Sequence, residues 1–219
     1  MKTKLLIWFM FFLSVFILNH VHIKANNLNL LGKEIYIDPG HGGRDSGAIY
    51  KNIYEKDINL IMSQKIAKHL VAKGAIVYLT RETDIDLSTS TTNKKRSDLS
   101  NRAKMINDSR ADMYISIHLN YINSAKWQGL QIFYNNKHND NEKIANSLTK
   151  FLKQKSSNIR EPKKENIYYM YKQIKIPGVL IELGFLSNAN DRYRLTREKY
   201  QENLAIDIAN AIENYFLTN

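Results

Sequence analysis

Hydrophobic positions along the chain follow two periodicities, which predict strands and helices in alternation. Short runs rich in β-branched and aromatic residues indicate strands at 34–38, 75–80, 113–117, 129–134 and 179–181. Longer stretches with apolar residues three and four positions apart indicate helices at 55–73, 99–109, 141–155 and 197–216. This alternation predicts an α/β fold with a mostly parallel central sheet flanked by helices.

Three polar segments separate these elements. Residues 39–47 form a glycine-rich turn, 84–98 a polar surface loop, and 156–171 a polar loop that carries tyrosines. The chain shows no internal repeat, linker or low-complexity tail after its first 25 residues. Residues 26–219 are therefore expected to form one domain.

The N-terminus has the pattern of an export signal. Lys2 and Lys4 precede an apolar run at 5–18, which is typical of a secretory signal and short of the roughly 20 residues that span a bilayer. The run is apolar on every side, which argues against an amphipathic helix buried in the domain. A cleavage site near Ala25 is poorly marked, so residues 1–25 are expected to be a signal peptide or an N-terminal membrane anchor. Either reading places the protein outside the cytoplasmic membrane, as a secreted or anchored chain.

Composition restricts the binding partners and the metal ligands that this protein can use. With 32 Lys plus Arg and 21 Asp plus Glu, the net charge is +11, and loss of the leader's three lysines leaves about +8. Such a charge suits anionic wall polymers or lipid headgroups, or serves solubility alone; no nucleic-acid motif accompanies it. The absence of cysteine excludes disulfides, thiol catalysis and thiolate zinc sites. Any metal must be held by histidine and carboxylate.

Four candidate functional residues fall at one edge of the predicted sheet. His41 lies in the turn after the first strand, His118 directly follows the third, and Glu182 directly follows the last. Glu55 opens the first helix near the same edge. Sites in open α/β sheets lie beyond the carboxyl ends of the strands. The four side chains are therefore expected to converge on one rim.

Two histidines and one glutamate suit a hydrolytic zinc site, which leaves one position open. Such a site also needs a carboxylate that is not a ligand, to accept a proton from water. Glu182 fits this second role because burial at a strand end raises a carboxylate pKa. Taken singly, His41 could cap a helix, His118 could be a core histidine, and Glu55 could be a helix-terminus charge. The other histidines are interpreted as structural, solvated or part of the leader: His20, His22, His69 and His138.

Four segments resemble, in order, the motifs of the zinc-dependent N-acetylmuramoyl-L-alanine amidases (amidase type 3). They are residues 38–48 (DPGHGGRDSGA), 55–57 (EKD), 116–120 (SIHLN) and 179–188 (VLIELGFLSN). The resemblance implies that His41, Glu55 and His118 bind one zinc ion and that Glu182 is the catalytic carboxylate. The implied reaction cuts the amide between the lactyl group of muramic acid and L-alanine in peptidoglycan.

Within that family the chain is most similar to germination-specific spore-cortex amidases. The signs are the short leader, the lack of wall-binding repeats, and the segments 125–129 and 174–178. The likeness implies a first step towards muramic δ-lactam, followed by a separate deacetylase. No repeat module or inhibitory helix is recognisable, so control must come from the domain or from an accessory protein.

Three alternatives stay open. They are a general cell-wall autolysin of the same family, a zinc peptidase acting on the stem peptide, and a wall-binding module that has lost catalysis. The last predicts that one of the four key residues is missing, whereas the sequence retains all of them.

Secondary site residues are less specific. Asn120 could orient substrate or serve as a turn residue, and Arg81 could face an anionic substrate or pair with Asp84. Three tyrosines could line a glycan groove or pack in the loop: Tyr168, Tyr169 and Tyr171.

Overall fold

The computed structural model describes residues 28–219. The predicted leader, residues 1–25, lies outside the described residues. Within the described range, no helix combines the length and apolar character needed to cross a membrane.

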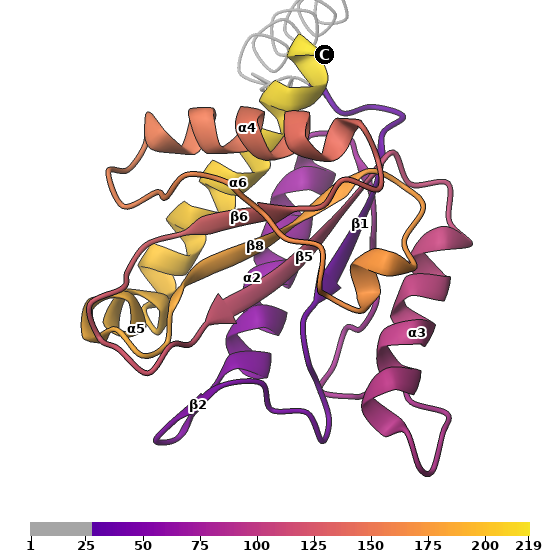
Figure 1. The fold of residues 1–219 in the computed structure, drawn as a ribbon. Coiled ribbons are helices and arrows are strands. Elements are labelled where there is room, and N and C mark those ends of the chain that lie inside the picture. Colours follow the sequence, from indigo (N-terminus) through magenta and orange to yellow (C-terminus); the bar gives the residue numbers. More distant parts are fainter. Residues whose placement is uncertain (1–27) are drawn as a thin grey trace, which may run out of the picture.

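A six-stranded sheet forms the centre of the domain, in the order β4-β1-β5-β8-β6-β7 (Figure 1). Its strands are β1 (Glu34–Pro39), β4 (Ile76–Leu79), β5 (Met113–Asn120), β6 (Gln131–Tyr134), β7 (Lys163–Lys164) and β8 (Gly178–Phe185). All neighbouring strands pair in parallel except β6 and β8, which are antiparallel. The expected α/β fold with a mostly parallel sheet is confirmed.

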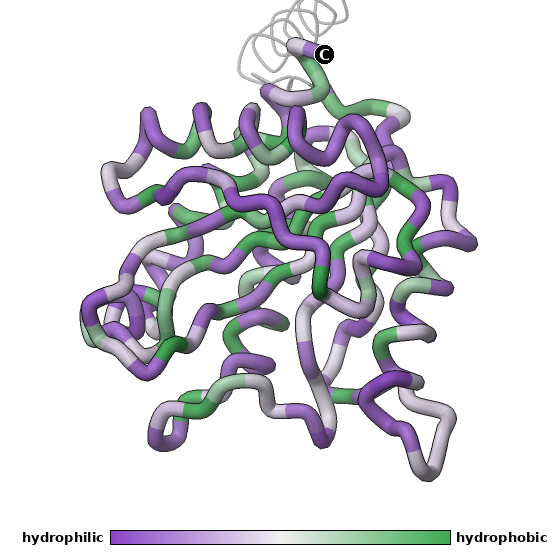
Figure 2. The backbone as a smooth tube through the Cα atoms, in the orientation of Figure 1, coloured by the Kyte–Doolittle hydropathy of each residue, from purple (hydrophilic) through white to green (hydrophobic). Residues whose placement is uncertain are grey.

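The helices cover the two faces of the sheet unequally. The larger core lies under α2 (Glu55–Ala72), α4 (Asp140–Lys153) and α6 (Glu198–Thr218), which pack on one another and on the strands. A smaller core on the other face lies under α3 (Lys94–Asn107) and the 3-10 helix η1 (Met170–Lys172). Figure 2 shows the corresponding pattern along α4, whose outer turns are hydrophilic.

Side-chain alternation along the strands decides which residues can form a site. In β1, Ile35 and Ile37 belong to the larger core, so Tyr36 and Asp38 point to the opposite face. The same alternation in β5 and β8 sends the polar residues near their carboxyl ends to the face of α3. That face is only partly covered by helix, which leaves room for a pocket.

Several boundaries differ from the sequence-based predictions. β5 and β8 run beyond 117 and 181, so His118 and Glu182 lie within strands and not after them. α3 begins at Lys94, five residues before the predicted start at 99, because its inner face carries the buried pair Asp98 and Arg102 where apolar residues were sought. Five short elements were not predicted at all: β2 (Ile49–Tyr50), β3 (Ile53–Tyr54), β7, η1 and α5 (Ala189–Leu195).

Candidate active site

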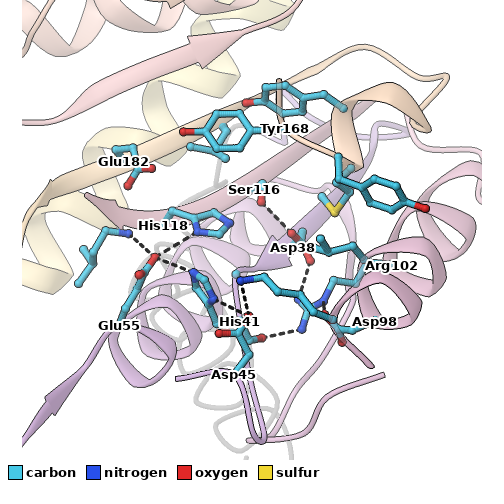
Figure 3. Close-up of a pocket in the computed structure, with 18 of the residues that line it drawn as sticks. Asp38, His41, Asp45, Glu55, Asp98, Arg102, Ser116, His118, Tyr168 and Glu182 are labelled. Carbon is cyan, nitrogen blue, oxygen red and sulfur yellow. Dashed lines mark hydrogen bonds and ion pairs between the residues drawn. The ribbon is translucent and has the colours of Figure 1, made fainter. Parts of the chain in front are cut away.

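A pocket of about 360 Å³ opens at the carboxyl ends of β1, β5 and β8 (Figure 3). His41, Glu55, His118 and Glu182 all line it, and so does Asn120. The expectation that these residues converge on one edge of the sheet is therefore met by the geometry. The opposite wall is formed by α3 and by the tyrosine-bearing segment that leads into η1.

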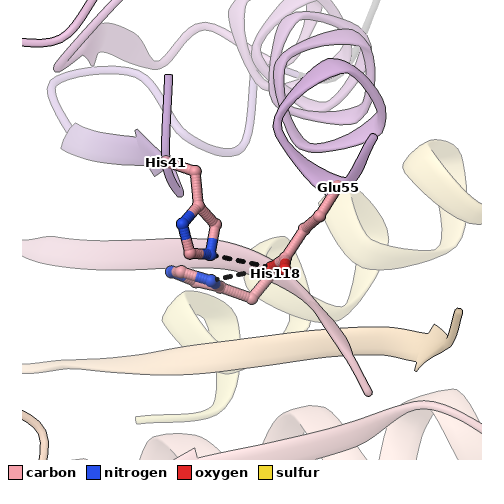
Figure 4. Close-up of side chains that lie close together, drawn as sticks. All are labelled: His41, Glu55 and His118. Atoms are coloured by element: carbon pink, nitrogen blue, oxygen red, sulfur yellow. Dashed lines mark hydrogen bonds and ion pairs between the residues drawn. The ribbon is translucent and has the colours of Figure 1, made fainter. Parts of the chain in front are cut away.

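Three of these side chains form a compact cluster (Figure 4). The Oε1 atom of Glu55 lies 3.1 Å from Nε2 of His41 and 3.1 Å from Nδ1 of His118. The two imidazole rings are nearly perpendicular, with centroids 5.0 Å apart. One nitrogen of each ring therefore converges on the same carboxylate oxygen.

The turn after β1 is shaped to admit this cluster. His41 has φ of 62°, a left-handed conformation that non-glycine residues rarely adopt and that is commonly found at functional sites. A Cβ atom on Gly40 would lie 2.3 Å from the ring of His118, and one on Gly47 would lie 2.6 Å from a Glu55 oxygen. These two glycines allow the backbone to pass directly against the cluster.

Glu55 is held in its ionised form. Its side chain is buried at the first position of α2 and accepts hydrogen bonds from the backbone N–H groups of Ala48 (2.8 Å) and Leu119 (3.0 Å). Burial alone would raise its pKa, but its contacts with His118 and His41 outweigh that effect and lower the pKa below its ordinary value.

His41 is flanked by a second carboxylate. Its Nδ1 lies 3.0 Å from Oδ2 of Asp45. Burial would lower the imidazole pKa, but the contacts with Asp45 and Glu55 prevail and raise it to about 9. A carboxylate on the outer nitrogen orients a histidine ligand and increases its basicity.

The cluster fits a metal ion by its donor set and spacing. Its ligand atoms all lie within 4.8 Å of one another. A tetrahedral zinc ion with bonds of about 2.0–2.2 Å holds its ligand atoms roughly 3.3–3.6 Å apart, close to the observed spacing of the Glu55 oxygen from each imidazole. The cluster is thus a candidate metal site with two nitrogen ligands and one oxygen ligand.

Glu182 occupies the strand position next to His118. The two residues are partners in the β5–β8 register. Glu182 is 7% exposed, and its Oε2 atom has no hydrogen-bond partner among the described residues. Burial and the nearby charge of Glu55 raise its pKa to about 8. A buried carboxylate without donors beside a candidate metal site is equipped to exchange a proton.

A second buried network beneath the pocket was not anticipated from the sequence. Asp38 accepts hydrogen bonds from Thr80 (2.6 Å), Ser116 (2.7 Å) and Arg102 (2.9 Å). Arg102 also pairs with Asp98 and donates to the backbone carbonyl of His41. The network therefore anchors the turn that carries a candidate ligand. The available signal was the i, i+4 spacing of Asp98 and Arg102.

The structure gives Arg81 a different place from the one expected. Its guanidinium is buried and donates to the carbonyls of Pro39, Gly40 and Lys56. All the hydrogen bonds found for this guanidinium go to backbone carbonyls. Arg81 therefore has a structural role and does not make the expected contact with substrate. Asp84, its proposed alternative partner, pairs with Lys56 instead. Asn120 does reach the pocket, and its contact with substrate stays a prediction.

These features define an α/β domain with a candidate metal centre, and comparison with known proteins specifies its family. The family of N-acetylmuramoyl-L-alanine amidases matches residues 35–214, and the chain belongs to that family. It is 40% identical to the germination-specific N-acetylmuramoyl-L-alanine amidase of Bacillus subtilis, over 97% of this chain and 96% of that protein.

Solved structures agree with this assignment. The CwlD amidase of Clostridioides difficile, in complex with the GerS lipoprotein, superposes with a TM-score of 0.80 and 38% identity, over 85% of this chain and 100% of that one. An N-acetylmuramoyl-L-alanine amidase of Clostridium difficile 630 gives a TM-score of 0.76 and 32% identity, over 85% and 98%.

Proposed function

We propose that this amidase uses zinc held by His41, Glu55 and His118, with Glu182 as its general base. The observation that carries the proposal is the register of β5 and β8. It sets the carboxylate of Glu182, whose Oε2 has no hydrogen-bond partner among residues 28–219, beside His118 on the face of the sheet that carries the His–Glu–His cluster.

The chain's own residues supply the proton transfers. When bound, zinc polarises the substrate carbonyl and lowers the pKa of water. Glu182 accepts the proton of the attacking water while the new C–O bond forms on the lactyl carbonyl. It then gives that proton to the nitrogen of L-alanine as the C–N bond breaks, which leaves a free amine and a muramic carboxylic acid that ionises to the carboxylate by losing its own proton to solvent. Asp45 keeps the imidazole of His41 oriented throughout.

The substrate is proposed to be spore-cortex peptidoglycan. Support comes from the 40% identity to a germination-specific amidase over nearly the whole of both chains. Removal of stem peptides there would be the first step towards muramic δ-lactam, with a separate deacetylase acting on the product. A general cell-wall autolysin of this family would instead cleave vegetative wall with equal efficiency.

The site of action and an accessory partner belong to the same proposal. A cell-wall substrate requires export, for which residues 1–25 are the expected signal or anchor. The CwlD structure contains a lipoprotein partner, and an accessory protein of that kind is proposed to bind this chain.

One digestion experiment tests the reaction. Purified zinc-loaded protein is incubated with cortex and with vegetative peptidoglycan, and the new amines are identified by mass spectrometry. The proposal expects free L-alanine amino groups on intact stem peptides, with cortex preferred. New amines inside the stem peptide would identify a peptidase, and no cleavage at all, with and without an accessory partner, would indicate a binding module.

The zinc ligands have an independent test. A His41→Ala, His118→Ala double variant is expected to lose zinc, as measured by metal analysis, while circular dichroism stays that of the wild type. Full zinc occupancy in that variant would remove the cluster from the mechanism.

A further inference from the structure

Three neighbouring tyrosines on the wall facing the metal cluster have different environments. The hydroxyl of Tyr169 accepts a hydrogen bond from Arg96 (3.0 Å) and contacts Ser100 (3.1 Å). The hydroxyl of Tyr171 is buried and donates to the carbonyl of Phe133 (3.3 Å). Within residues 28–219, the hydroxyl of Tyr168 makes no hydrogen bond. Its O–H group is therefore available to donate to a bound molecule.

The ring of Tyr168 is nevertheless held in place. It packs edge-to-face against Tyr171, with centroids 5.3 Å apart, and against Phe133 at 6.5 Å. Such pairs favour this geometry and fix the direction of the ring. The residue lines the pocket and is 36% exposed, so a bound molecule can reach its hydroxyl.

The hydroxyl is directed towards the reacting centre. Figure 3 shows Tyr168 on the Glu182 side of the pocket, with its hydroxyl end turned towards that carboxylate. Burial raises the pKa of Tyr168 to about 12, together with the charges of Glu182, Glu165 and Glu55. The hydroxyl therefore stays protonated and acts as a donor. Tyr168 and the residues of the cluster line the same pocket, so a molecule bound there can contact both.

We propose that Tyr168 is a further catalytic residue, whose hydroxyl donates a hydrogen bond to the scissile carbonyl oxygen as that oxygen gains negative charge. The inference rests on the proposed amidase mechanism. When the water oxygen bonds to the carbonyl carbon, the π electron pair of the carbonyl moves onto the carbonyl oxygen. The Tyr168 O–H stabilises that oxygen without losing its proton. The hydrogen bond weakens when the C–N bond breaks and the carbonyl re-forms. Donors positioned in this way act on the transition state more than on the bound substrate.

The test is Tyr168→Phe, which removes the hydroxyl and keeps the stacked ring. Kinetics on soluble peptidoglycan fragments with intact stem peptides are expected to show kcat lowered about 10- to 100-fold, with KM within about twofold. Zinc content and Tm should match the wild type. Tyr169→Phe is the matched control from the same segment, and its kcat is expected to stay within about twofold.

Other outcomes overturn the proposal. A raised KM with unchanged kcat would make Tyr168 a ground-state binding residue, and unchanged kinetics would leave it as packing. If Tyr168→Phe perturbs zinc or Tm, 3-fluorotyrosine at position 168 decides, since it keeps the ring and supplies a stronger donor. Its kcat is expected to equal or exceed that of the wild type, and a kcat as low as that of Phe would reject the hydrogen bond. Failure of the amidase mechanism is distinct, because the wild-type protein would then release no L-alanine amine.

Discussion

Asp38 and Glu182 are both buried carboxylates near the carboxyl ends of strands in the same sheet, separated by the single strand β5. Their surroundings differ completely. Asp38 accepts three hydrogen bonds, one of them from the guanidinium of Arg102. Burial opposes its ionisation, but Arg102 and the two hydroxyls prevail and lower its pKa. In the part of the chain that the structure describes, Glu182 has no such partners, and its pKa rises to about 8.

The comparison distinguishes a structural carboxylate, Asp38, from a carboxylate suited to catalysis, Glu182, although both are buried. A buried charge with matched donors stabilises the fold around it, and removing one partner is costly. A buried carboxylate without donors destabilises the fold, and proteins retain such groups mainly where a reaction needs them. The same substitution, acid to amide, should therefore have opposite effects at the two positions.

The largest expected effect is on the activity of Glu182→Gln. The amide is nearly isosteric but cannot accept the proton of water, so kcat should fall by about 10²–10⁴-fold. Zinc content and Tm should not fall, because Glu182 has no hydrogen-bond partner to lose within residues 28–219. Amide cleavage, metal content and melting are measured on one preparation. Near wild-type cleavage by a folded, zinc-loaded variant would exclude Glu182 as the base.

Asp38→Asn should lower the stability of the fold more than Glu182→Gln does. It leaves the charge of Arg102 buried beside a neutral amide, which costs about 3–5 kcal/mol in comparable networks. In a chain of this size the Tm should fall by roughly 10 °C. The surface carboxylate Asp108, which pairs with Lys104, provides the control, and Asp108→Asn should change stability by less than about 1 kcal/mol. Equal effects at both sites would mean that the buried network is not stabilising.

The pH dependence of unfolding sharpens the comparison further. In metal-free protein the folded-state pKa of Glu182 is raised to about 8, so its protonated form favours the fold, and that stability is lost as pH rises towards and through 8. Glu182→Gln should remove this loss, so at pH 9 its free energy of unfolding should exceed that of the wild type by about 1–3 kcal/mol. Asp38 acts in the other direction, because its lowered pKa gives stability that is lost in acid. Denaturant titrations at pH 5 and pH 9 measure both trends.

The smallest expected effect concerns proton release on zinc binding. His41 has a pKa of about 9 without metal, and a ligand imidazole must be neutral. Zinc binding at pH 7.5 should therefore release about one proton from His41, seen by calorimetry in buffers of different ionisation enthalpy. Affinity should rise with pH up to about 9. Asp45→Asn removes one cause of the raised pKa and should reduce the number of protons released at pH 8.

The sequence predicted the fold class and the convergence of His41, Glu55, His118 and Glu182, because strand ends and motif order are local properties. It could not predict which polar side chains have their hydrogen bonds made within the protein and which remain free to bind substrate. Arg81 was expected at the substrate because a basic residue after a strand resembles a binding residue, and only three-dimensional packing shows its guanidinium bound to carbonyls. Likewise, Tyr168 is indistinguishable from its neighbouring tyrosines until the three hydroxyls are placed in space.

The pairing of β5 with β8 also has a consequence for how this chain can evolve. His118 faces the pocket only because it lies an odd number of positions from residues whose side chains enter the larger core, and Glu182 follows the same rule in its own strand. Inserting or deleting one residue upstream in either strand would exchange the two faces, moving the polar residues into the core and the core residues into the pocket. Point substitutions around the site can be sampled one at a time, whereas length changes within these two strands should be absent from any library selected for activity.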